Sequence, residues 1–418
     1  MSWFAFVTIG LIVARCLAQL WLDAVNRRHV LAHAAAVPPA FKEIIDSATY
    51  AKSVQYTLAK SQFNRLETVF DAVLLVLILF TGVLPAAFAI FADRLGTSAW
   101  GMAACLWLIG VALTVPSLPF EWYAQFHLEQ RFGFNTTTPR LWWIDRLKAL
   151  LLGLVIGYPL LVLVLKIIGW TGRWWWLWAW AALMAFQLLM LVLAPVLIMP
   201  LFNKFTPLPE GTLCERLLAL AKRTGFRAQS IQIMDGSKRS QHSNAFFTGF
   251  GRFRKIVLFD TLLKQLSEPE LEAVLAHEIG HYKKKHILRF LFMYAAMALL
   301  AFYLLSVLAQ QSWFYEAFGF APSSKNIVPA LLLFALLSGL VSFWLSPLFN
   351  LWSRRYEYQA DAFAASAMKE PRSLIGALRK LNEKNLSNLT PHPLYSGFYY
   401  SHPTLLEREG ALTVQPLG

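Results

Sequence analysis

The chain has 418 residues, of which 57% are hydrophobic and only 15% are charged. A soluble globular protein carries about 25% charged residues, so this composition excludes a set of soluble domains and indicates a chain embedded in lipid. The net charge of +14 is compatible with binding to nucleic acid or with cationic loops beside a membrane. The three cysteines form no CxxC pair, which argues against a disulfide scaffold and against a thiolate zinc site.

Seven stretches are long and apolar enough to cross a bilayer, which takes roughly 20 residues. They cover residues 2–20, 69–91, 99–119, 149–168, 174–198, 287–309 and 327–349. The first has neither a basic leading region nor a cleavage site, so we expect an uncleaved span rather than a signal peptide. It contains Arg15, whose side chain we expect to extend to the nearer membrane surface.

The Lys and Arg residues are divided unequally between the two sides that seven spans would create. Residues 21–68, 120–148, 199–286 and 350–418 hold 32 of the 38, whereas the alternate segments hold four. Because positive charge favours the cytoplasmic side, we expect the N-terminus outside and the C-terminus in the cytoplasm. Membrane topology accounts for the charge, so we expect no nucleic-acid partner.

The predicted fold is a mainly α-helical, polytopic membrane protein. Spans one to five would make a membrane region over residues 1–198, and spans six and seven would occupy 287–349. Residues 199–286 and 350–418 would be cytoplasmic, and each is too short to bury a comfortable core alone. We therefore expect these two parts to pack into one domain that the last two spans interrupt.

The first cytoplasmic part contains signals for both helix and strand. Ser267, with Pro269 in the first turn and Glu270 three positions on, predicts a capped helix that begins near residue 268. The remaining predicted elements are a helix at 213–223 and short strands at 231–234, 244–250 and 255–259, the last two joined as a hairpin through Gly251–Arg254. No other β structure is predicted.

The capped helix carries the pattern HExxH at residues 277–281. His277 and His281 are four positions apart and share one helix face, so both rings can bind one ion. Glu278 lies beside the first histidine, where it can reach a water molecule on the metal without binding the metal itself. A catalytic zinc site uses three protein ligands, so the pattern predicts a third one elsewhere. A helix with two satisfied histidines near a membrane surface is the alternative.

A candidate for the third ligand follows the last span. Glu357 and Asp361 are four positions apart in a segment that reads as helical. One carboxylate can bind the metal while the other accepts a hydrogen bond from a ligating histidine. The alternative is a solvated acidic face beside Arg354 and Arg355. Both candidate helices adjoin spans, so we expect the last two spans to hold the ligands together.

Several further blocks accompany these residues in order. They are Phe132–Asn135, Pro200–Phe205 with Pro207 and Leu208, Ser243–Phe247, Ala276–His281, Glu357 with Ala360–Ala362, and Ser401–Pro403 with Arg408. In this order and on this topology, the chain resembles the CAAX prenyl protease 1 family of integral-membrane zinc metalloproteases. The resemblance covers nearly the whole chain, and it implies a gluzincin-like zinc domain with a small β-sheet. The compact loops favour a bacterial member, in the inner membrane.

The resemblance also implies roles for individual residues. It makes His277, His281 and Glu357 the ligands of one Zn²⁺ ion, and Glu278 the general base. The family assigns the Asp361 position as a proton donor, whereas its chemistry favours a partner of a ligating histidine. His402, together with Arg408, would stabilise the oxyanion. The stretch Asn244, Ala245 and Phe246 would bind an extended peptide along its edge.

The predicted activity is peptide-bond hydrolysis by metal-activated water, in the C-terminal processing of prenylated or membrane-associated peptides. General quality control of membrane proteins, with no prenyl requirement, is the alternative. We expect a monomer whose partners are the bilayer and a peptide or protein substrate, lipidated or not. Lys283–Lys285 directly after HExxH argue against an intramembrane protease. Five spans before the motif argue against the shorter heat-shock type, and the complete ligand set argues against a transporter with a vestigial site.

Overall fold

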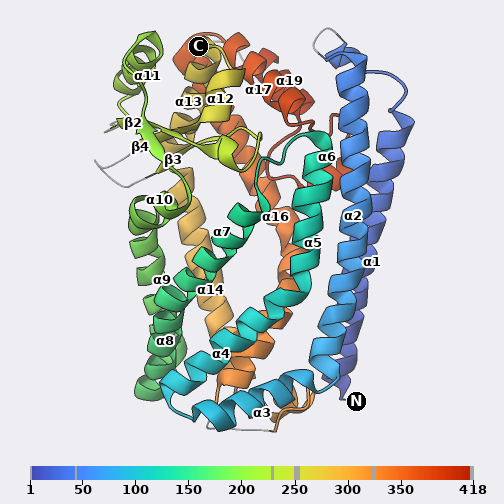
Figure 1. The fold of residues 1–418 in the computed structure, drawn as a ribbon, viewed down its shortest axis with the longest axis vertical. Coiled ribbons are helices and arrows are strands. Elements are labelled where there is room, and N and C mark those ends of the chain that lie inside the picture. Colours follow the sequence, from blue (N-terminus) through green and yellow to red (C-terminus); the bar gives the residue numbers. More distant parts are fainter. Residues whose placement is uncertain (1, 43–44, 227–229, 249–254, 322–325, 415–418) are drawn as a thin grey trace.

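A computed structural model describes residues 2–42, 45–226, 230–248, 255–321 and 326–414. The molecule is elongated, and its long helices run along one axis (Figure 1). The strands and the C-terminal helices gather at the end of the molecule opposite the N-terminus. This arrangement separates a helical shaft from a mixed α/β head.

The shaft consists of apolar helices that are long enough to cross a membrane. In the part of the chain that the structure describes there are five such helices, or up to six if one bent pair is counted as a span. They are α1 (Trp3–Ala32), the stretch Ala99–Phe132, the stretch Pro139–Phe202, α14 (His286–Leu308) and α16 (Val328–Met368), with α2 (Ser47–Phe80) and α3 (Val83–Leu95) as the bent pair. The stretch Ala99–Phe132 comprises α4 (Ala99–Thr114), α5 (Leu118–Tyr123), a π-helical turn at Ala124–Glu129 and α6 (Gln130–Phe132).

One expected span is broken by a bend. The apolar run at 69–91 was expected to form one span, but α2 ends at Phe80 and α3 leaves it at 57°. Gly82, between them, has a φ of 80°, a left-handed conformation that glycine adopts without a Cβ clash. The apolar run at 69–91 is therefore divided between two helices, which together can still count as one span.

Two other expected spans lie within a single helical stretch of 64 residues. It comprises α7 (Pro139–Leu152), a π-helical turn at Gly153–Gly157, α8 (Tyr158–Thr171), a 3₁₀ turn at Gly172–Trp174, α9 (Trp175–Leu193), a π-helical turn at Ala194–Ile198 and α10 (Met199–Phe202). Gly172 has a positive φ of 54°, and α8 and α9 lie side by side on either side of this turn (Figure 1). The chain thus reverses direction at Gly172.

Arg15 faces other helices and does not reach toward the membrane surface as expected. Its Nη1 donates to the backbone oxygen of Gly339 in α16 at 3.2 Å, and its guanidinium lies 5.7 Å from the ring centre of Phe343. The side chain therefore ties α1 to α16, which is how ionisable groups at lipid depth are usually accommodated.

The head contains a four-stranded mixed sheet in the order β1-β2-β4-β3. The strands are β1 (Phe205–Pro207), β2 (Ser230–Met234), β3 (Ala245–Thr248) and β4 (Lys255–Phe259). β2 and β4 are parallel, and the outer pairs are antiparallel. β1 was not predicted, and the predicted turn at Gly251–Arg254 lies outside the described residues. β3 is an edge strand of the sheet.

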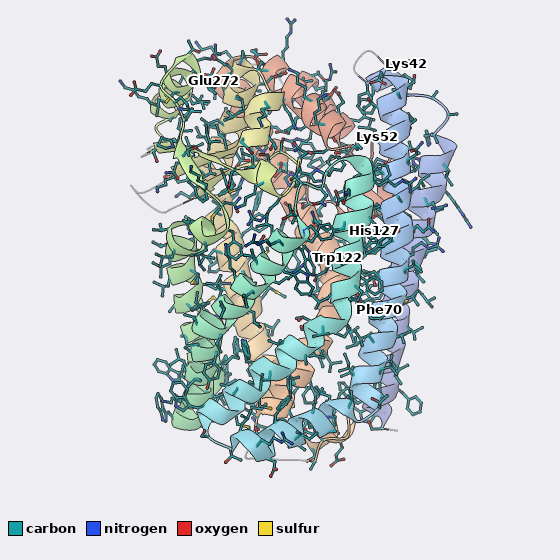
Figure 2. All side chains as sticks on the ribbon, viewed as in Figure 1. Lys42, Lys52, Phe70, Trp122, His127 and Glu272 are labelled. Atoms are coloured by element: carbon teal, nitrogen blue, oxygen red, sulfur yellow. The ribbon has the colours of Figure 1, made fainter. Side chains whose placement is uncertain are left out.

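The helices of the head share one hydrophobic core with the sheet. They are α11 (Thr212–Arg223), α12 (Asp260–Gln265), α13 (Glu268–Lys283), α17 (Arg372–Lys384) and α19 (Leu405–Val414). α18 (Pro393–Tyr399) packs instead against α16 and α1, and α15 (Ser312–Glu316) lies in the shaft. Leu217, Ile256, Leu275 and Leu374 are all fully buried in this core. Glu272 of α13 (Figure 2) binds two arginines of α11, at 2.8 and 3.0 Å. Residues that precede α14 in the chain and residues that follow α16 therefore pack together in the head.

Candidate functional site

The site begins with the capped start of α13. Ser267 and Glu270 form the expected capping box, in which the Ser267 N–H donates to Glu270 Oε2 at 2.7 Å. Leu271, Leu275 and Ile279 bury one side of this helix in the core of the head. His277 and His281 share another face, as their spacing predicted.

A second helix meets this face at very short range. A Cβ added at Gly280 would lie 2.9 Å from Cα of Ala360 in α16, closer than real Cβ atoms approach. Glycine at this position therefore permits the two backbones to touch. The contact brings Glu357 of α16, which is 3% exposed, against both histidines.

The three side chains present their ligand atoms at nearly equal distances. His277 Nε2 and His281 Nε2 lie 3.2 Å apart. Glu357 Oε2 lies 3.4 Å from the first nitrogen, and Oε1 lies 3.3 Å from the second. In a tetrahedral zinc site with bonds of about 2.1 Å, two ligand atoms are about 3.4 Å apart. The three residues therefore fit Zn²⁺, and they form a group able to hold a metal ion.

Two further observations support a cation at this point. Glu357 is buried, so its carboxylate charge is shielded from water and requires a positive partner within the site. Burial lowers the pKa of His277, but hydrogen bonds to Asp361 and Glu357 outweigh it and raise the pKa to about 9. The buried carboxylates of Asp361 and Glu357 thus favour positive charge at this point, as a bound metal would supply.

His277 is held from outside by a charged pair. Its Nδ1 lies 2.8 Å from Asp361 Oδ1, and Arg408 donates from Nε to the other carboxylate oxygen at 2.8 Å. Arg408 Nη2 also donates to Oδ1, and Arg408 as a whole is 8% exposed. Asp361 therefore occupies the partner position that orients a ligating histidine. Arg408, expected to help stabilise the oxyanion, pairs with Asp361, and its Nη1 also lies 3.7 Å from Glu357 Oε2.

His281 is held by a neutral chain of groups that the sequence analysis missed. Its Nδ1 lies 3.0 Å from Nδ1 of His286, and His286 Nε2 lies 3.0 Å from Gln359 Oε1. Binding of a metal through His281 Nε2 requires a hydrogen on its Nδ1. With a metal bound there, that hydrogen would be donated to His286 Nδ1, and His286 would then donate its own hydrogen from Nε2 to Gln359. His286 is 1% exposed and stacks on Tyr356.

The predicted acid–base residues lie close to this group. Burial raises the pKa of Glu278, and the charge of Glu357 adds to the effect against opposing contributions from nearby histidines. A raised pKa brings a carboxylate closer to the range in which a general base works at neutral pH. His402 Nδ1 lies 2.8 Å from Glu357 Oε2, and its side chain is 64% exposed. His402 therefore contacts the buried metal group on one side and is accessible to a substrate on the other.

The predicted peptide-binding stretch lies on the edge of the sheet. Asn244 directly precedes β3, and Ala245 and Phe246 belong to it, paired with Leu258 and Val257 of β4. β3 also contacts α13, the helix that carries the two histidines. An extended peptide added to this edge would run beside that helix.

Comparisons with known proteins cover both the helical shaft and the head. Residues 26–204 match a family model described as CAAX prenyl protease N-terminal, five membrane helices, and residues 207–414 match peptidase family M48. CAAX prenyl protease 1 of Saccharomyces cerevisiae is 39% identical, covering 90% of this chain and 88% of the yeast protein. A CAAX prenyl protease 1 homolog of Homo sapiens is 33% identical, covering 93% and 91%. The crystal structure of S. mikatae Ste24p superposes with a TM-score of 0.91 over 99% of both chains, at 34% identity.

Proposed function

Because this chain belongs to the CAAX prenyl protease 1 family of M48 metalloproteases, we propose that it removes C-terminal peptides from prenylated proteins. The observation that carries the proposal is the arrangement of His277, His281 and Glu357, whose ligand atoms have the mutual distances of a tetrahedral zinc site. The chain is an integral, multi-pass membrane protein, so a lipidated substrate would reach the site from the bilayer.

In this proposal each polar residue has one task. Zinc, when bound, supplies a Lewis acid that polarises the scissile carbonyl and activates water. Glu278 takes a proton from the attacking water and delivers it to the leaving amine. His402 stabilises the negative charge that develops on the carbonyl oxygen. Asp361 and Arg408 act through His277 by fixing its ring, and β3 aligns the peptide from Asn244 onward.

The proposal includes seven spans with the head in the cytoplasm. The stretch of 64 residues at 139–202 would be about 96 Å long as one straight helix, three times the thickness of a bilayer core. Its turn at Gly172 supports counting it as two spans. The concentration of Lys and Arg in alternate segments supports an external N-terminus and a cytoplasmic C-terminus. We also propose that the protein works as a monomer.

The central experiment compares wild type with Glu278→Gln in the purified full-length protein. With a farnesylated peptide as substrate, the variant should lose kcat by roughly 10²- to 10⁴-fold while it retains zinc. A chelator should abolish wild-type activity, and added zinc should restore it. A variant that keeps the wild-type rate would exclude the proposed role of Glu278.

A matched peptide without the prenyl group separates the two substrate classes. Preferential cleavage of the farnesylated peptide supports C-terminal processing of prenylated proteins. Equal cleavage of both peptides would favour general proteolysis of membrane proteins instead.

A further inference from the structure

A cavity of about 610 Å³ lies beside the metal group. His402 and Arg408, which contact Glu357 and Asp361, line it at one side. Lys60 and other residues of α2 line it elsewhere, together with the segment around residues 382–388. Its volume falls within the range of small-ligand sites, so it has room for a short peptide. The cavity thus extends from the catalytic group to α2.

The charges of this cavity all have one sign. Its described lining includes Lys60 and Arg408 but no Asp or Glu, and amide and tyrosine side chains supply most of the other polar groups. Arg408 is already committed to Asp361 by two hydrogen bonds. An occupant with a negative charge and several carbonyl groups would match this lining.

Lys60 is the cation of this cavity that remains available. Among the residues that the structure describes, no carboxylate lies within salt-bridge distance of its ammonium. The ammonium donates a long bond of 3.5 Å to the Tyr56 hydroxyl and lies 5.0 Å from the centre of the Tyr56 ring. The Tyr56 hydroxyl itself donates to Glu129 at 2.6 Å, and Glu129 also lies 3.3 Å from His242. Glu129 is thus engaged by other groups, and Lys60 can take a new anionic partner.

We propose that Lys60 binds the terminal carboxylate of the peptide substrate. This inference rests on the proposed function, in which the scissile bond lies a few residues from the end of the substrate. Three extended residues span about 10 Å, and the fragment that they form ends in a carboxylate. Lys60 would fix that end in the cavity while the scissile carbonyl lies at His402. The cavity then selects substrates by the distance from the cleaved bond to the free C-terminus.

The test compares two farnesylated peptides that differ only at the C-terminus, one a free acid and the other a primary amide. Wild type in detergent should cleave the acid with a kcat/KM roughly tenfold to hundredfold higher, because a charge-assisted hydrogen bond is lost in the amide. In Lys60→Met this preference should disappear through a higher KM for the acid. Lys60→Arg, which keeps the charge, should retain it.

Lys52→Met is the matched control, since Lys52 lies on the same helix, is exposed and does not line the cavity (Figure 2). It should keep the wild-type preference for the acid. Equal cleavage of acid and amide by wild type, or an unaltered preference in Lys60→Met, would overturn the inference and leave the proposed function intact. Cleavage of neither peptide by wild type would overturn both.

Discussion

The two histidines of the metal group are held by chemically different neighbours. His277 is fixed by the carboxylate of Asp361, which also accepts hydrogen bonds from Arg408. His281 is fixed by the ring of His286, which in turn is hydrogen-bonded to the amide of Gln359. Both of these groups are neutral. A carboxylate both orients a ligating ring and increases its basicity, whereas a neutral acceptor mainly orients it. The two sides should therefore contribute unequally to metal affinity.

Both sides depend on the same contact between helices. The histidines lie on α13, whereas Asp361, which contacts His277, and Gln359, which reaches His281 through His286, lie on α16. The distance between the two helices therefore sets the first contact directly and the second through His286. We expect Gly280→Ala to have the largest effect, because its Cβ would push against the Ala360 backbone at 2.9 Å. Displacing both partners at once should weaken zinc binding by roughly hundredfold or more, as measured by competition with a chelator.

Gly410→Ala is the matched control for that variant. Gly410 lies in α19, and a Cβ there would meet nothing within 4 Å, so the change should not weaken zinc binding. If Gly280→Ala bound zinc like wild type, the close contact of α13 and α16 would not govern the site.

The charged side is tested by Asp361→Asn. The amide keeps the shape of the side chain but removes the negative charge that faces His277 and Arg408. Zinc affinity should fall by about 10- to 100-fold, measured by the same chelator competition. Arg408→Lys, which preserves the charge but not the paired donors, should cause a smaller loss. Wild-type affinity in Asp361→Asn would show that the carboxylate does not support His277.

Parts of this site could be predicted because they depend on spacing along one helix. The capping box located the start of α13, four-residue spacing placed His277 beside His281, and the same spacing paired Glu357 with Asp361. The contact between the two helices could not be derived from spacing, since it depends on Gly280 meeting Ala360 in three dimensions.

The role of His286 was hidden by a break in the helix. Residues five apart in an uninterrupted helix point about 140° away from each other, so periodicity gave no reason to pair His286 with His281. α13 ends at Lys283, and Lys285 has a φ of 58°, which turns the chain before α14 begins at His286. Likewise, hydropathy does not reveal the bend after Phe80, where Gly82 takes a left-handed conformation, or the strand β1, which forms by pairing with β2.

The neutral side should give the smallest effect. His286→Leu removes the acceptor for the hydrogen on His281 Nδ1, so the ring loses its orientation and its preferred tautomer. Zinc affinity should fall by about tenfold, at the low end of the range for such partners. His286→Gln, whose side-chain oxygen still accepts a hydrogen bond, should recover part of the loss in the same competition assay. A loss in His286→Leu equal to that in Asp361→Asn would mean that orientation alone, without the charge of a carboxylate, accounts for what both partners contribute.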